Sequence, residues 1–159
     1  MPSPTTLLEA IQAAWTADAA LAALVPDSRA YFGKVPPAGS IGDDDPTTPE
    51  MPYARIEKPA GETGLRTNAS LYLDQTVIVH VWTDSSDAGD QIAAEVERVL
   101  TQNLQWTAGA VIDCRFKPHS IAQVDQPEIR QWETVCAFAM RTWQPRTDIQ
   151  SSSSSSSGS

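Results

Sequence analysis

Residues 71–83 read LYLDQTVIVHVWT, and this stretch decides the kind of fold that the chain can form. Its second half is rich in β-branched and aromatic side chains, which is typical of a β-strand. Successive side chains of a strand point to opposite faces of a sheet, so the residues of one parity are predicted to face the core: Leu71, Leu73, Val77, Val79 and Val81. His80 is predicted to lie on the other face, hydrogen-bonded under a helix or at an interface.

A helix is predicted to follow this strand directly, over about residues 86–103. The sequence TDSSD at 83–87 is rich in residues that cap helix N-termini. Arg98 lies near the other end, where the helix dipole favours a cation. The apolar side chains after the turn recur at helical spacing and form one face: Ile92, Val96, Val99, Leu100 and Leu104.

The chain before the long strand predicts helical structure and then two extended segments. An apolar stripe at helical period indicates a helix over about residues 5–15. A second helical segment, capped by Thr16 or Asp18, is predicted to end at Pro26, because proline cannot continue a helix. The extended segments that follow are residues 29–34 and 53–58.

Two more strands are predicted near the C-terminus. In the first, over 110–117, one parity contains Ala110, Ile112, Cys114 and Phe116, and the other contains Val111. The second, over 131–143, is apolar on both faces, which is typical of a central strand or of one buried in an oligomer. The element order predicts an α+β fold, with a mainly antiparallel sheet of about four to five strands and two helices packed on one face.

Two polar segments are long for a compact domain, and long loops are often functional. Residues 35–52 contain many prolines and glycines around Asp43, Asp44 and Asp45. Residues 59–70 are predicted to form an extended hairpin arm between two antiparallel strands, and this arm carries Glu62 and Arg66. We expect both segments to be surfaces for contact with neighbouring molecules.

The chain has 159 residues and a net charge of −9. We predict one domain over 1–148 and a flexible serine-rich tail over 149–159, because serine cannot bury apolar surface. An acidic chain lacks the basic face by which proteins read nucleic-acid sequences. No apolar run approaches the roughly 18 residues that a membrane helix needs, and the start of the chain lacks the basic region of a secretory signal.

The residue patterns of common active sites are absent from the sequence. Three adjacent aspartates do not alternate as calcium-loop ligands do, and His80 and His119 belong to no zinc-binding pair. No GxSxG motif and no phosphate-binding glycine loop occurs. Cys114 and Cys136 are expected to be free, buried thiols. We therefore predict no catalytic, cofactor-binding or metal-binding residue, and we expect that the protein is not an enzyme.

Several segments together resemble a known family. The chain begins with LLEAIQAAWTADAALAALV, continues with RAYFGKVPP and MPYARIEK, reaches the strand end VIVHVWTD and then the helix DAGDQIAAEVERVL. This order resembles the tail terminator, or tail completion, proteins of long-tailed bacteriophages and related gene-transfer particles. The resemblance covers residues 7–104 well and 110–143 in pattern only, while the aspartate-rich loop and the serine tail depart from it.

The resemblance implies a structural role in a virion. Such proteins form a hexameric ring on the head-proximal end of the tail tube, where the ring stops tube polymerisation and provides the docking surface for the head. The implied partners are other copies of the chain, the tail tube protein and the head–tail connector or neck protein, with DNA passing through the lumen and assembly in the host cytoplasm. The candidate assembly residues are Asp43, Asp44, Asp45, Glu62, Arg66 and Trp143.

Two other functions are compatible with the sequence. One is another head–tail joining or tube-like virion protein, since these share small α+β folds and ring assembly. The other is a small enzyme or ligand-binding module that uses the acidic loop with a divalent ion.

Overall fold

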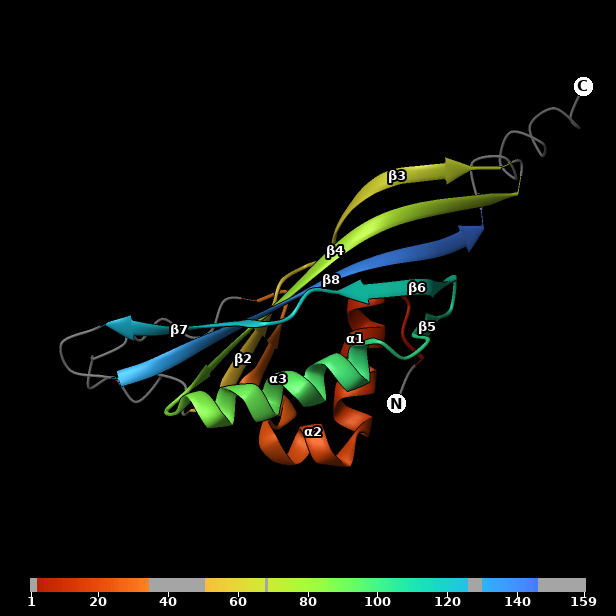
Figure 1. Ribbon diagram of the computed structural model, residues 1–159. Helices are drawn as coiled ribbons and strands as arrows, with labels where there is room; N and C mark the ends of the chain where they lie inside the picture. The colour runs from red at the N-terminus through yellow and green to blue at the C-terminus, as the bar shows by residue number, and fades with distance from the viewer. Residues whose placement is uncertain (1–2, 35–50, 68, 126–129, 146–159) are drawn as a thin grey trace, which may run out of the picture.

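The computed structural model describes residues 3–34, 51–67, 69–125 and 130–145 (Figure 1). These residues form the helices α1 (Leu7–Ala17), α2 (Ala19–Leu24) and α3 (Ser86–Leu100), and a 3-10 turn at Asp27–Arg29. They also form eight strands: β1 (Ala30–Phe32), β2 (Tyr53–Ile56), β3 (Ala60–Arg66), β4 (Ser70–Thr83), β5 (Gln105–Trp106), β6 (Gly109–Phe116), β7 (Ser120–Asp125) and β8 (Arg130–Pro145).

The sheet is built around a ribbon of two long strands. β4 and β8 pair antiparallel from Ser70 opposite Pro145 to Thr83 opposite Trp132. Each long strand carries two shorter neighbours end to end on its outer edge, β3 and β2 on β4, and β6 and β7 on β8. β1 then pairs parallel with β2, and β5 pairs antiparallel with β6.

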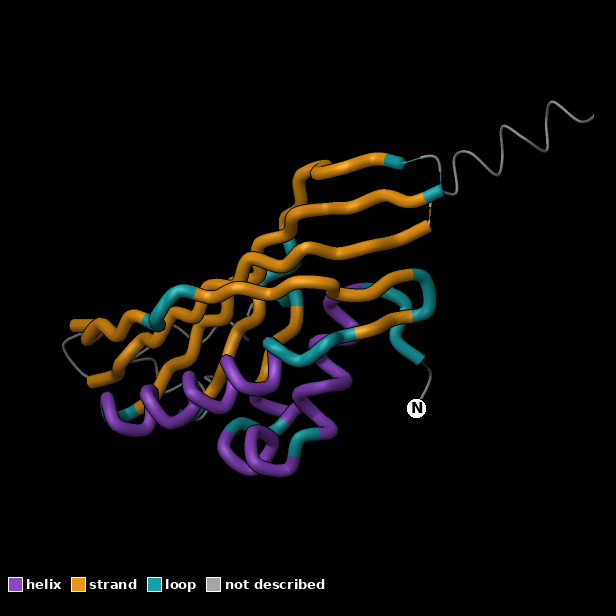
Figure 2. Tube along the Cα trace, turned by 45° about the vertical axis from the view of Figure 1, so that its right-hand side comes forward, coloured by secondary structure: helices purple, strands orange, loops and turns teal. Residues whose placement is uncertain are grey.

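The helices pack on one face of this sheet (Figure 2). Alternate residues of β4 and β8 point towards them and form a continuous core with the apolar face of α3. Those strand residues and their helical partners are fully buried or nearly so: Val77, Val79, Val81, Cys136, Phe138, Met140, Ile92, Val96, Val99 and Leu100. The parity predicted for the second half of β4 is confirmed.

The helix starts follow from side-chain caps. Thr6 Oγ1 accepts a hydrogen bond from Glu9 N, and Ser85 Oγ accepts one from Ala88 N. Asp18 ends α1 and caps α2, since its extended backbone breaks the helix and its Oδ1 accepts from Leu21 N at 3.0 Å. Trp15 then joins the two helices because its Nε1 donates to Val25 O at 2.9 Å.

The α+β class and the mainly antiparallel pairing are confirmed, but the predicted numbers of elements are wrong. The described residues form eight strands instead of four to five. All three predicted helical segments are helices, one more than the two expected to pack on the sheet. The segment predicted as a hairpin arm contains β3, and β5 and β7 were not predicted. β3 and β7 are polar strands held by backbone hydrogen bonds to β4 and β8, so their sequences carry little apolar alternation.

The predicted parity of β6 is wrong at its start. The register of β6 against β8 shifts between Val111 and Asp113. This irregularity turns Val111 into the core, where it is 4% exposed, and leaves Ile112 50% exposed. A β-bulge reverses an alternation pattern without any signal in apolar periodicity.

Candidate assembly surface

One end of the ribbon extends beyond the three helices (Figure 1). We call this region the arm; it consists of β3 and the paired ends Ser70–Thr76 of β4 and 139–145 of β8. Both faces of the arm carry half-buried apolar side chains: Leu71 and Leu73 on the helix side, and Tyr72 and Trp143 on the other. A ribbon with apolar side chains on both faces is suited to contact with another molecule.

Three of the six candidate residues come together on this arm. Glu62 lies on β3 opposite Asp74, and the exposed Arg66 lies at the end of β3 opposite Leu71. Trp143 lies on β8, and its Nε1 donates to Ser70 Oγ at 2.8 Å. Asp43, Asp44 and Asp45 lie outside the described residues. The same holds for residues 149–159, so the predicted serine-rich tail and the domain boundary stay predictions.

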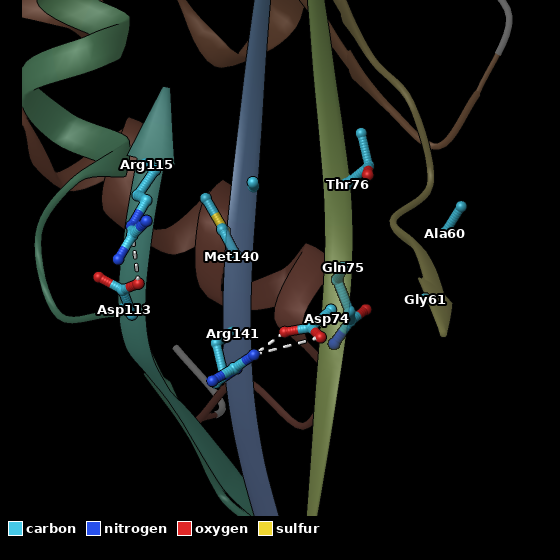
Figure 3. Close-up of a pocket in the computed structure, with 10 residues that line it drawn as sticks. Ala60, Gly61, Asp74, Gln75, Thr76, Asp113, Arg115, Met140 and Arg141 are labelled. Carbon is cyan, nitrogen blue, oxygen red and sulfur yellow. Dashed lines mark hydrogen bonds and ion pairs between the residues drawn. The ribbon is translucent and has the colours of Figure 1, made fainter. Parts of the chain in front are cut away.

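The helix-free face of the arm is charged at its centre (Figure 3). Arg141 Nε donates to Asp74 Oδ1 at 2.8 Å, and its hydrogen bonds hold the pKa of Asp74 below the ordinary value. On β6, Arg115 Nε lies 3.3 Å from Asp113 Oδ2. These residues line an open depression of about 630 Å³. Exposed ion pairs of this kind contribute little to stability.

The sequence did not reveal a second polar cluster on the same face, around His80. Nδ1 of His80 lies 2.9 Å from Oε1 of Glu133, and its Nε2 lies 3.6 Å from Oε2 of Glu57. Trp82 stacks between His80 and Tyr53, with ring centroids 5.8 and 4.8 Å away. Strand parity correctly placed His80 on this face, but its partner Glu133 could be identified only from the register of β8.

Burial alters the chemistry of one residue of this cluster. Tyr53 is 6% exposed, and burial, with a smaller contribution from the nearby Glu133 carboxylate, raises the pKa of Tyr53 to about 12. The phenol is protonated at neutral pH even at its ordinary pKa, and the shift extends this neutral packing role to higher pH. The cluster is thus an aromatic patch with two carboxylates, on the side of the sheet opposite the helices.

His119 fastens the turn between β6 and β7 to helix α3. Its Nε2 lies 2.7 Å from Asp90 Oδ1 and its Nδ1 lies 2.9 Å from Glu97 Oε1. The hydrogen bonds to these two carboxylates raise the pKa of His119 above the ordinary value. Only the imidazolium can donate from both nitrogens at once, so the doubly protonated form fits this geometry.

Among the described residues, no group of three or more histidine, cysteine, aspartate or glutamate side chains is arranged so that it could hold a metal ion. Cys114 and Cys136 are free thiols, and burial raises the pKa of Cys136 to about 12. No helix in the described ranges is long and apolar enough to cross a membrane.

Comparison with solved structures finds a likeness in fold. No family model and no curated protein matches the chain. Among solved structures, the chain is similar to one from the "Virion of native gene transfer agent (GTA) particle", with a TM-score of 0.61 and 20% sequence identity. The match covers 85% of this chain and 94% of that chain. At this identity the likeness establishes a shared fold over nearly the whole length of both chains.

Proposed function

We propose that the chain is a structural protein of a phage-like virion, with no catalytic role. The observation that carries this proposal is the likeness to a chain of a gene-transfer-agent virion. The match covers 94% of that virion chain, so the two chains share the same fold over almost all of it. The arm supports the proposal, since it presents apolar and charged side chains beyond the helix-covered core.

Within such a particle, we propose that six copies form a ring on the head-proximal end of the tail tube. The ring would stop tube polymerisation, provide the surface on which the head docks and let DNA pass through its centre. A closed ring uses a head-to-tail contact that terminates when the last copy joins, as a cap requires. The net charge of −9 suits a lumen that repels phosphates and lets a duplex slide.

We assign the ring and tube contacts to the arm. Arg66 is exposed at its end, and the half-buried Trp143 is held there by the hydrogen bond to Ser70. The sheet there presents apolar side chains on both faces, so one face can contact a neighbouring copy while the other contacts the tube. The arm residues Glu62, Arg66 and Trp143 are thus the proposed contact set within the described chain.

The experiment mixes the purified chain with polymerising tail-tube subunits and images the products by electron microscopy. We expect short tubes with ring-shaped density at one end. Arg66→Glu should weaken this capping, whereas Lys34→Glu, the same charge change at an exposed residue away from the arm, should not. Tubes of unlimited length with monomeric protein in solution would disprove the capping role.

A second candidate is another head–tail joining or tube-like virion protein, because the matched structure is described by its particle and not by a position in it. Binding assays against isolated tube and neck components distinguish the two, since a terminator binds both. A small metal-binding module is tested by thermal unfolding with millimolar calcium, magnesium or manganese. Stabilisation above about 2 kcal/mol would indicate a true site.

A further inference from the structure

The outer edge of β6 is open. One edge of β6 pairs with β8, while on the other edge β5 pairs only with Gly109 and Ala110. Val111 N donates to Leu104 O, and beyond that point no described strand pairs with residues 112–116 on this side. Half of the backbone donors and acceptors of a strand point to each edge, so this segment offers a template for a further strand.

The side chains of this segment are unusually exposed for their type. Ile112 and Phe116 are 50% and 45% exposed, and they are the exposed large apolar residues of the described chain. Asp113 and Arg115 have side chains that are 54% and 85% exposed. Charged side chains and a β-bulge, such as Asp113, Arg115 and the register shift before Asp113, discourage nonspecific pairing, so a partner strand must match these charges.

The sequence of this edge is complementary to itself. Residues 112–116 read IDCRF, and an antiparallel copy centred on Cys114 places Ile112 opposite Phe116 and Asp113 opposite Arg115. Because the arrangement is two-fold symmetric, both the apolar pair and the ion pair occur twice. We propose that two copies of this chain associate through this edge, with their β6 strands antiparallel and Cys114 at the two-fold axis.

The faces of the sheet agree with this register. Cys114 and Phe116 lie opposite Met140 and Phe138 of β8, so they share the helix side of the sheet with the core. Asp113 and Arg115 lie opposite Arg141 and Ala139, on the helix-free face. Cys114 and Phe116 of both copies therefore lie on the helix side of the joined sheet, and the charged residues meet on the other face. Ile112 falls within the register shift between Val111 and Asp113 and faces no residue of β8.

The register also continues a charge pattern across the sheet. Asp74 of β4 lies opposite Arg141 of β8, which lies opposite Asp113 of β6. Across β4, β8 and β6 the facing side chains are therefore acidic, basic and acidic in turn. In the proposed dimer, Arg115 of the second copy is the next side chain in this row. Opposite charges on directly facing strand residues stabilise pairing, and like charges destabilise it. β7, the other strand on this side of β8, reads SIAQVD, and an antiparallel copy of it forms no ion pair.

This association is a property of the free chain and does not depend on the proposed ring. A two-fold contact uses the same surface on both copies, whereas a ring contact joins two different surfaces. The two proposals can consequently fail separately: ring formation is measured on tube ends, and the β6 pairing is measured without any tube.

The test uses charge reversal on a single strand. Asp113→Arg leaves two arginines on β6, and Arg115→Asp leaves two aspartates, so each variant places like charges opposite each other in its own dimer. Sedimentation equilibrium over a range of concentrations should show a monomer–dimer equilibrium for the unaltered chain and about tenfold weaker association for each variant. An equimolar mixture of the two variants should restore association as mixed dimers.

Two controls make the result specific. The double variant Asp113→Arg with Arg115→Asp reverses both charges and should dimerise more strongly than either single variant, although it places a second cation opposite Arg141 within each copy. Asp84→Arg makes the same charge change as Asp113→Arg at an exposed turn residue and should leave association unchanged. Circular dichroism confirms that every variant is folded, as expected for exposed side chains.

The proposal is overturned by any of three results. An unaltered chain that stays monomeric at all concentrations rules out the contact. Variants that associate as strongly as the unaltered chain show that this edge is not involved. If the mixture of the two variants does not associate, the two-fold register is excluded. Pairing of β6 with β3 of another copy would give the same failure, and it would also produce assemblies larger than dimers.

Discussion

Gly89 allows α3 to approach the sheet closely, and replacing it by alanine gives the sharpest test of the packing. A Cβ at this position would overlap Thr134 Oγ1 of β8, while its next neighbours, Thr83 Oγ1 and Ile121 Cδ1, would lie at 3.4 and 3.7 Å. Gly89 is buried within the helix. The overlap should cost about 1–3 kcal/mol, as overpacking does in other cores.

Two effects set the net result. Alanine stabilises a helix interior by about 1 kcal/mol relative to glycine, so Gly89→Ala should lower the free energy of unfolding by up to about 2 kcal/mol. In a Thr134→Ala background the obstructing oxygen is gone, and Gly89→Ala should instead raise that free energy by about 1 kcal/mol. Thr134→Ala alone should lower the free energy of unfolding by less than about 1 kcal/mol, because removing a buried oxygen without a hydrogen-bond partner offsets part of the loss of the buried methyl group.

The assay is equilibrium urea unfolding followed by circular dichroism for the four members of this double-mutant cycle. Thr134→Ser is the matched control, since it keeps the oxygen and should preserve the destabilisation by Gly89→Ala. The predicted result is that Gly89→Ala lowers the free energy of unfolding when Thr134 is present and raises it in the Thr134→Ala background. Equal destabilisation by Gly89→Ala with and without the Thr134 oxygen would refute the close approach of α3 to β8.

Three further predictions follow from other contacts. Because the pKa of His119 is raised, its contacts stabilise the fold fully below the ordinary histidine pKa, and this stabilisation is lost as pH rises through the folded-state pKa. His119→Gln should therefore lower the free energy of urea unfolding more at pH 5.5 than at pH 8.5. An equal loss at both pH values would contradict the assignment. Phe138→Ala should lower the free energy of unfolding by about 3–5 kcal/mol in thermal or urea unfolding, because Phe138 is 1% exposed in the core, and a loss under 1 kcal/mol would show that the site is loosely packed. Trp143→Phe removes the hydrogen bond to Ser70, so it should lower the free energy of unfolding by about 1 kcal/mol and increase amide hydrogen exchange in the arm. Unchanged exchange would show that this hydrogen bond does not order the arm.

The sequence was sufficient to predict the elements whose stability comes from apolar burial. The alternation in the second half of β4 and the helical spacing of Ile92, Val96 and Leu100 both describe faces that lie in the core. The cap at Asp18 was one of the two predicted alternatives, because capping depends on residues only a few positions apart. Local physical rules therefore give these elements directly.

Elements held by backbone pairing were not predictable in the same way. β3 and β7 are ordered by hydrogen bonds to the long strands, and such bonds form with any side chain. Leu71 and Leu73 have the predicted parity but are only half-buried, since their part of β4 runs past the helices. The length of a strand relative to its covering layer is not encoded in its alternation.

The candidate surface was predicted in part. Glu62, Arg66 and Trp143 lie on one arm, although they are far apart in the chain, because β3 and β8 both pair with the same end of β4. The clusters around His80 and Arg141 depend on which residue of β8 faces which residue of β4. Pairing register joins residues more than fifty positions apart and needs the three-dimensional structure.

The ribbon of β4 and β8 also determines the order in which a newly synthesised chain can fold. Thr83 pairs with a residue 49 positions later, and Ser70 pairs with one 75 positions later. At about 5–20 residues per second, a ribosome needs about 4–15 s to add the 75 residues between Ser70 and its partner. During that time α3, which follows β4 immediately, is the element available to cover its apolar face. The long strand would thus leave the ribosome with a helical cover before its strand partner exists, which limits its chance of aggregating with other nascent chains.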